Sequence, residues 1–280
     1  MTLSHELLQH ACMALNQNGL SPAAHFAKKG NDARVHQLIS MLHGKPKDAA
    51  YGYVLAGAFE KAAALLEQSS SEAEQEAIKK SMVRGAARAN QLEALKAFIP
   101  NRADYADAEV CGLAERGELE ALGNLVNLNL DLYQDAIQGF ARTAQTEALL
   151  DHLKMGSFHL YAIFQAAEAG HKDLVHELLA SSNVASESTT KTIFSEGDTI
   201  AYKALLNHAV KGYAKGCHFN EAIAILDKGA SIMQCSSELP ASISIEDIKA
   251  ATEPVTFDML DGFIAEYAAS AAHRSYPDSV

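Results

Sequence analysis

Residues 87–99 read ARANQLEALKAFI, and the same pattern returns at residues 114–126 (AERGELEALGNLV) and 167–179 (AEAGHKDLVHELL). Each copy has a small residue first, a turn residue three positions later, and apolar residues five, eight and nine positions beyond the turn. Weaker copies follow the same frame, so the turn positions fall at 30, 57, 90, 117, 144, 170 and 217. Most intervals are 26 or 27 residues, with one of 33 and one of 47, and such a regular period is typical of stacked repeats.

This repeat frame describes two helices joined by a tight turn. In residues 92–99 apolar side chains recur at i, i+3 and i+7, which is one stripe of an amphipathic helix. The small residue before the turn lies on the preceding helix, where a small side chain lets two backbones approach. Glycine at the turn can adopt positive φ and end that helix, and Asn90 is the next best residue for this conformation. Ala144 and Cys217 suit it poorly, so we expect their turns to be strained or built differently.

One repeat cannot bury its apolar stripe alone, whereas stacked repeats can. The sequence therefore predicts an all-α fold, an α-solenoid of about seven stacked αα-hairpin repeats with capping helices at both ends. Residues 1–20 are expected to form the N-terminal capping helix (with a helix over 3–16), residues 21–230 the solenoid, and residues 231–280 a C-terminal helical cap with a short disordered tail. A segment rich in Ser and Thr at about 181–198 predicts a long surface loop, either a plain insertion or a contact loop for a partner.

The repeat frame resembles the second half of the ankyrin repeat, which reads close to AAxxGHLEVVKLLL. Residues 86–93 and 166–171 match it best, and residues 226–231 resemble the close of such a repeat. The chain departs from the family in lacking the Thr-Pro-Leu-His opening and in its period of 27 rather than 33. Both differences predict shortened helix-turn-helix units without the β-hairpin. Tetratricopeptide repeats fit less well, because their period is 34 and this chain has no Trp.

Composition limits the kinds of partner. A formal net charge of −12 opposes binding to the phosphates of nucleic acid, and no run of Lys or Arg offers a local exception. The four cysteines, Cys12, Cys111, Cys217 and Cys235, are scattered, which predicts reduced thiols rather than disulfides or a zinc site. The first residues have no signal-peptide pattern, and no apolar stretch is long enough to cross a membrane. We therefore expect a cytoplasmic protein that binds neither nucleic acid nor membranes.

No motif for catalysis emerges from the sequence. The HELL strings at residues 5–8 and 176–179 lack the second His that a zinc protease motif places four positions after the first. Cys217 next to His218 occupies a turn position, with no third group placed to orient the His. The chain also lacks the phosphate-binding and dinucleotide-binding glycine motifs. The sequence thus predicts no catalytic residue, no metal site and no cofactor.

In ankyrin arrays the concave face commonly meets the partner. The residues two positions before each turn would project onto that face: Lys28, Leu55, Arg88, Glu115, Arg142, Glu168 and Lys215. We name this row the concave strip, and its six charged members, Lys28, Arg88, Glu115, Arg142, Glu168 and Lys215, are the candidate contact residues. Two readings of the strip stay open, contact with a partner or simple ion pairs between adjacent repeats.

We expect a non-catalytic protein-protein interaction scaffold that binds its partner along the concave face. Two alternatives remain. One is a bacterial effector translocated into a host cell, by analogy with other ankyrin-like proteins. The other is an enzyme or small-ligand receptor whose site lies between the solenoid and residues 181–280.

Overall fold

The computed structural model describes residues 9–42, 44–126, 132–153, 158–189, 196–239 and 259–266, with the side chains of 182–189 and 196–201 left undescribed. Within these ranges the chain is helical and has no β-strand. An inner row is formed by α2 (Pro22–Lys28), α4 (Pro46–Leu55), α6 (Glu72–Arg88), α8 (Ala106–Arg116), α10 (Tyr133–Arg142), α12 (His159–Glu168) and α14 (Glu196–Lys215).

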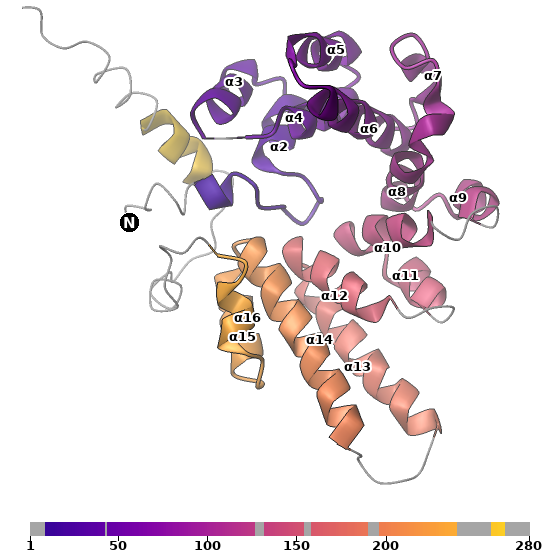
Figure 1. Ribbon diagram of the computed structural model, residues 1–280, viewed down its shortest axis with the longest axis vertical. Coiled ribbons are helices and arrows are strands. Elements are labelled where there is room, and N and C mark those ends of the chain that lie inside the picture. The colour runs from indigo at the N-terminus through magenta and orange to yellow at the C-terminus, as the bar shows by residue number, and fades with distance from the viewer. Residues whose placement is uncertain are drawn as a thin grey trace, which may run out of the picture.

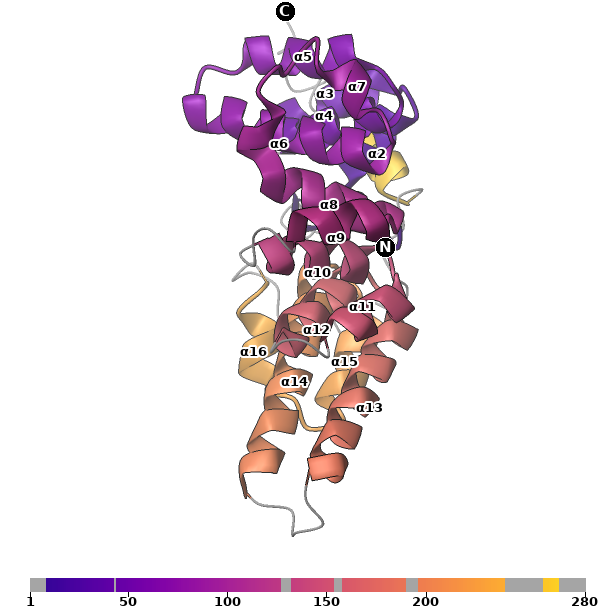
Figure 2. The same ribbon diagram turned by 90° about the vertical axis from the view of Figure 1, so that its right-hand side faces the viewer.

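An outer row is formed by α3 (Asp32–Met41), α5 (Phe59–Gln68), α7 (Leu92–Leu95), α9 (Leu119–Val126), α11 (Thr146–Leu153), α13 (Lys172–Thr189) and α15 (Phe219–Leu226). A 3₁₀ helix, η1 (Arg102–Tyr105), precedes α8, and α16 (Ile232–Ser236) packs on α14. Each inner helix packs against the next, and each outer helix packs on its own partner (Figures 1 and 2). The expected all-α, solenoid-like stack of hairpins is confirmed.

All seven turn positions take up the left-handed conformation that the repeat frame predicts. The φ angles are 72° at Gly30, 76° at Gly57, 58° at Asn90, 81° at Gly117, 53° at Ala144, 78° at Gly170 and 59° at Cys217. At each turn the next residue donates its N–H to the carbonyl five positions back, at 2.7–3.0 Å, which closes the end of the inner helix. Ala144 and Cys217 therefore share the common geometry and bear its steric cost.

The inner helices touch through a seam of small residues. Five positions before the turn, Gly52, Gly85, Gly112, Gly139 and Gly212 face the preceding inner helix. A Cβ on Gly112 would lie 2.3 Å from the Arg84 carbonyl oxygen and 2.7 Å from the Cβ of Ala87. Ala87 is the small residue of the preceding frame, and Gly139 and Gly212 meet the corresponding Ala114 and Ala167 in the same way.

The seam is interrupted once, between α10 and α12. Gln165 stands at the position that glycine holds in the other repeats, and α10 packs less closely on α12 than the other inner helices pack on their neighbours. The Gln165 side chain fills the wider joint and accepts a hydrogen bond from Nε of Arg142 at 2.7 Å. This joint places a buried polar group on the concave side of the stack.

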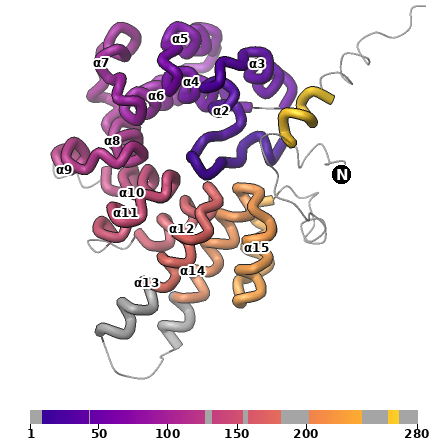
Figure 3. Tube along the Cα trace, turned by 180° about the vertical axis from the view of Figure 1, so that it is seen from behind, coloured from indigo at the N-terminus to yellow at the C-terminus, as the bar shows by residue number. Residues whose placement is uncertain are grey.

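The stack is curved, and the N-terminal segment lies between its two arms (Figure 1). The N-terminal segment passes through the hollow of the curve, where Nε2 of His10 lies 3.1 Å from the Ala214 carbonyl oxygen at the end of α14 (Figure 1). A helix over residues 259–266 lies beside α3, joined to it by the Arg34–Asp261 ion pair at 2.5 Å (Figure 3). The hollow is therefore partly enclosed by segments from both ends of the chain.

Two expectations about helix limits are wrong. The surface loop expected at 181–198 is largely helical, since α13 continues to Thr189 and α14 begins at Glu196. No Gly or Pro stands between residues 171 and 196. Because a helix already begun gains a hydrogen bond with each further residue, the polar composition of this stretch did not end α13. The helix expected over 3–16, whose residues 3–8 lie outside the described ones, ends at Ala11, where the chain turns through hydrogen bonds from Met13 N–H to the His10 carbonyl and from Ala14 N–H to the Ala11 carbonyl.

Three further expectations concern the chain ends, the cysteines and membrane-spanning helices. Residues 1–8, 240–258 and 267–280 lie outside the described residues, and the expected disordered tail falls among them. All four cysteines are buried and free. Among the described residues, no helix is both long enough and apolar enough to cross a bilayer.

The glycine seam can be tested at Gly112 and Gly139. We expect Gly112→Ala and Gly139→Ala each to lower the free energy of unfolding by about 1–3 kcal/mol, because the added methyl group collides with a backbone carbonyl. Gly123→Ala, in α9 with nothing near its would-be Cβ, should instead raise it by about 0.5–1 kcal/mol. Urea denaturation measures all three, and equal effects at the three positions would refute the seam.

The strained turn at Ala144 gives a second test. Ala144 is exposed, so Ala144→Gly should relieve left-handed strain without losing packing and raise the free energy of unfolding by up to about 1 kcal/mol. Ala148→Gly, within α11, should lower it by about 1 kcal/mol. Thermal and urea denaturation of the two variants would show opposite signs, and a loss of stability in both would contradict the strain.

Candidate functional site

The concave strip lies at the C-terminal ends of the inner helices, but its members are not equivalent. Glu115 and Glu168 are 3% and 4% exposed, whereas Lys28 is exposed at the end of α2 and does not line the hollow. The structure brings Arg88 together with Glu115, and Arg142 and Lys215 together with Glu168. The two carboxylates therefore lie behind the surface as counter-ions. Of the two explanations for the strip, ion pairs between repeats match these contacts.

Glu115 is the centre of the first cluster. Nε and Nη2 of Arg84 both donate to its Oε1, and the Tyr51 hydroxyl donates to its Oε2 at 2.6 Å. Arg88 donates to the Tyr51 oxygen at 2.8 Å and lies 3.8 Å from Glu115. Burial alone would raise the pKa of Glu115, but the attraction of Arg84 and Arg88 and these hydrogen bonds outweigh it and hold the pKa below its usual value. Two arginines thus share one buried carboxylate.

Glu168 organises the second cluster at the wider joint. Its Oε1 lies 3.0 Å from Nζ of Lys215, and its Oε2 lies 3.5 Å from Nη2 of Arg142. Arg142 also donates a hydrogen bond to Gln165. With the side-chain amide of Gln138 flipped, its oxygen accepts from the two terminal nitrogens of Arg142 at 3.0 and 3.1 Å. Lys215 also lies over the ring of Phe164 at 5.1 Å. Here again two cations share one buried carboxylate.

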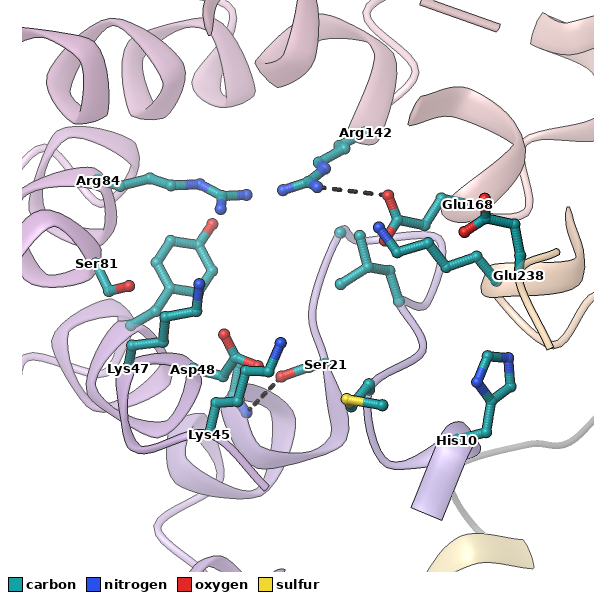
Figure 4. Close-up of a pocket in the computed structure, with 16 residues that line it drawn as sticks. His10, Ser21, Lys45, Lys47, Asp48, Ser81, Arg84, Arg142, Glu168 and Glu238 are labelled. Atoms are coloured by element: carbon teal, nitrogen blue, oxygen red, sulfur yellow. Dashed lines mark hydrogen bonds and ion pairs between the residues drawn. The ribbon is translucent and has the colours of Figure 1, made fainter. Parts of the chain in front are cut away.

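The two clusters form opposite walls of a cavity of about 440 Å³ in the hollow of the stack. In Figure 4 the guanidinium groups of Arg84 and Arg142 point toward each other across the cavity, with Lys45 and Lys47 projecting from a third side. The N-terminal segment closes part of the rim through Met13, Leu15 and Gly19. The cavity volume lies within the range usual for small-ligand sites.

The cavity carries an excess of positive charge. Five cations line it, namely Lys45, Lys47, Arg84, Arg142 and Lys215, against the three carboxylates Asp48, Glu168 and Glu238, an excess of two. The side chains of Lys45 and Lys47 form no hydrogen bond or ion pair with the described residues, although the backbone carbonyl of Lys45 accepts from the N–H groups of Asp48 and Ala49. His10 adds no charge at neutral pH, since burial lowers its pKa despite its backbone hydrogen bond. A cationic pocket in a chain of net charge −12 can attract an anion.

A smaller hollow of about 200 Å³ adjoins the cavity and shares Lys47 and Arg84 with it. Its far side is acidic, where Asp107 pairs with Lys80 at 2.6 Å and lies near Asp135. Burial, and then repulsion by Asp107, raises the pKa of Asp135 to about 6. The smaller hollow is thus lined by charges of both signs, with its carboxylates on the side away from the cavity.

Sequence analysis missed the residues that give the cavity its charge. Arg84 stands one helical turn before Arg88, and Lys47 stands two turns before the strip position in α4. A search along the same helix face at i−4 and i−8 would have found both. Lys45, by contrast, precedes α4, and only the curvature of the stack brings it to the cavity.

The described residues hold no cluster of three or more His, Cys, Asp or Glu suited to a metal ion. Burial raises the pKa of Cys111 to about 12, so at neutral pH its thiol is protonated and a poor nucleophile. Cations outnumber carboxylates among the groups that line the cavity, which suits the binding of an anion. No protein-family model, no curated protein and no solved structure matches this chain. The likeness to ankyrin repeats stays a resemblance of sequence pattern.

The Glu115 cluster predicts a pH-dependent stability. Glu115→Gln leaves two partly buried arginines short of a counter-ion and should lower the free energy of unfolding at pH 7 by about 3 kcal/mol. Because the pKa of Glu115 is lowered on folding, its stabilisation is complete above its ordinary value of 4.5 and disappears as the pH falls through the folded-state pKa. The difference between wild type and variant should therefore shrink in acid.

Urea denaturation at pH 7, 5 and 3.5 measures this difference. Glu118→Gln is the matched control, because Glu118 is exposed and pairs with Arg116 at the surface, where a pair contributes under about 1 kcal/mol. A Glu115→Gln variant with the stability of wild type at pH 7 would contradict the role given to the cluster.

Proposed function

We propose that this protein is a non-catalytic binding scaffold that captures a protein partner on its concave face. The observation that carries the proposal is the cavity, in which side chains from successive repeats converge while Lys45 and Lys47 keep their charges unpaired within the described residues. Solenoids commonly use such a concave surface, assembled from many repeats, to bind other proteins. Since the N-terminal segment covers part of the hollow, the partner inserts a side chain or short segment rather than lying along the whole groove.

Reversal of one cavity charge tests the scaffold. Lys47→Glu should reduce recovery of specific partner proteins on the immobilised chain by about tenfold or more, because a contact charge becomes repulsive. Lys96→Glu makes the same change of net charge on α7 in the outer row and should leave recovery unchanged. Quantitative mass spectrometry of proteins retained from native extract provides the measurement, with circular dichroism confirming that both variants fold.

A partner set identical for wild type, Lys47→Glu and Lys96→Glu would place any protein interface outside the cavity and refute the proposal. The same result would favour a second function, a receptor for a small ligand. One observation supports that alternative: Lys215 and Glu238, from the C-terminal part of the chain, line the cavity together with solenoid residues. A small ligand would then occupy the space between the solenoid and its C-terminal segment.

A further inference from the structure

The cations around the cavity are held in place before any ligand arrives. Arg84 is fixed by two hydrogen bonds to Glu115 and by the ring of Tyr51, 4.8 Å from its guanidinium carbon. Its remaining terminal nitrogen, Nη1, has no hydrogen-bond partner in the described part of the chain. Arg142 is fixed in the same way by Glu168 and Gln165. Preorganised donors of this kind lose little entropy on binding.

The cations that line the cavity are of two kinds: arginines already paired with carboxylates, and lysines whose side chains have no partner within the described residues. Arg84 and Arg142 face each other across the cavity with their carboxylates behind them, while the ammonium groups of Lys45 and Lys47 approach from a third side (Figure 4). Those lysines stand at the beginning of α4, a helix of ten residues whose N-terminus no side chain caps. The partial positive charge of that helix end adds to the field at the cavity.

The net charge of the cavity and the types of hydrogen-bond donor that line it favour a phosphate monoester over a carboxylate or a long polyanion. A carboxylate carries one charge, whereas a phosphate monoester carries about −1.5 to −2 at pH 7 and three strong acceptor oxygens. The excess of two positive charges matches the phosphate, and guanidinium and ammonium groups from different sides of the cavity suit its tetrahedral oxygens. A long polyanion is disfavoured by the net charge of −12 and by the enclosed rim.

We propose that the cavity between Arg84, Arg142, Lys45 and Lys47 is a binding site for a phosphate monoester. A volume of about 440 Å³ leaves room for the group that bears the phosphate as well as the phosphate itself. The ligand is either a small soluble phosphate or a phosphorylated side chain of the partner. The second case rests on the proposed scaffold function, whereas the first does not.

Calorimetry with the full chain tests the site. The probes are free O-phosphoserine, a short Gly/Ala peptide carrying one phosphoserine, and the unphosphorylated peptide, all at matched ionic strength. We expect saturable binding of at least one phosphorylated probe with a Kd of about 1 mM or tighter, and none of the unphosphorylated peptide. A peptide bound at least about tenfold more tightly than free phosphoserine identifies a protein-borne phosphate, and equal affinities identify a small soluble one.

Variants locate the binding. Lys47→Gln and Lys45→Gln should each weaken it about tenfold, the effect of losing one charge-assisted contact, while Lys96→Gln leaves it unchanged. Both lysine side chains lack partners within the described residues, so their neutralisation should spare the fold. Failure of both phosphorylated probes to bind, or binding insensitive to Lys45 and Lys47, overturns the proposal.

The failures of the two proposals can be told apart. If neither phosphorylated probe binds but Lys47→Glu still loses its partner proteins, the scaffold stands and the phosphate site is wrong. If phosphoserine binds but no partner depends on Lys47, the scaffold is wrong and the cavity is a small-ligand site.

Discussion

The close contact between glycine and backbone carbonyl along the inner helices is the constraint on which the rest of the structure depends. With a glycine at the seam, as at Gly112 and Gly139, one inner helix lies against the backbone of the helix before it. This contact fixes the spacing of the repeats and brings polar side chains 27 residues apart into register, as in the Lys80–Asp107 pair. The ladder of charges on the concave face is a consequence of the seam.

The one break in the seam coincides with one wall of the cavity. Gln165 replaces glycine between α10 and α12, and its side chain needs both space and hydrogen-bond partners. Arg142 supplies a donor, and Glu168 then lies close enough to balance its charge. A buried carboxylate shared between two cations is costly to desolvate unless every member is well paired, and here the arrangement leaves net positive charge facing the hollow.

Local patterns predicted the architecture well because they act over a few residues. The spacing of small, turn and apolar positions gave all seven left-handed turns, including those at Ala144 and Cys217. It failed where composition was used in place of a physical stop signal: no Gly or Pro stands between residues 171 and 196, and the Ser- and Thr-rich stretch continues as helix in α13. The concave strip was predicted from one position per repeat, and this choice passed over Arg84 and Lys47 on the same helix faces.

The sequence by itself determined the helical hairpins, their turns and their order, because helix periodicity and left-handed caps depend on neighbours within a few positions. Only the tertiary structure decided that Glu115 and Glu168 are buried counter-ions, that His10 meets Ala214, and that the hollow is a cationic cavity. The reason is curvature. The stack bends around the hollow, and the N-terminal segment crosses it to contact Arg142 and Ala214, so residues far apart in the sequence line one common space.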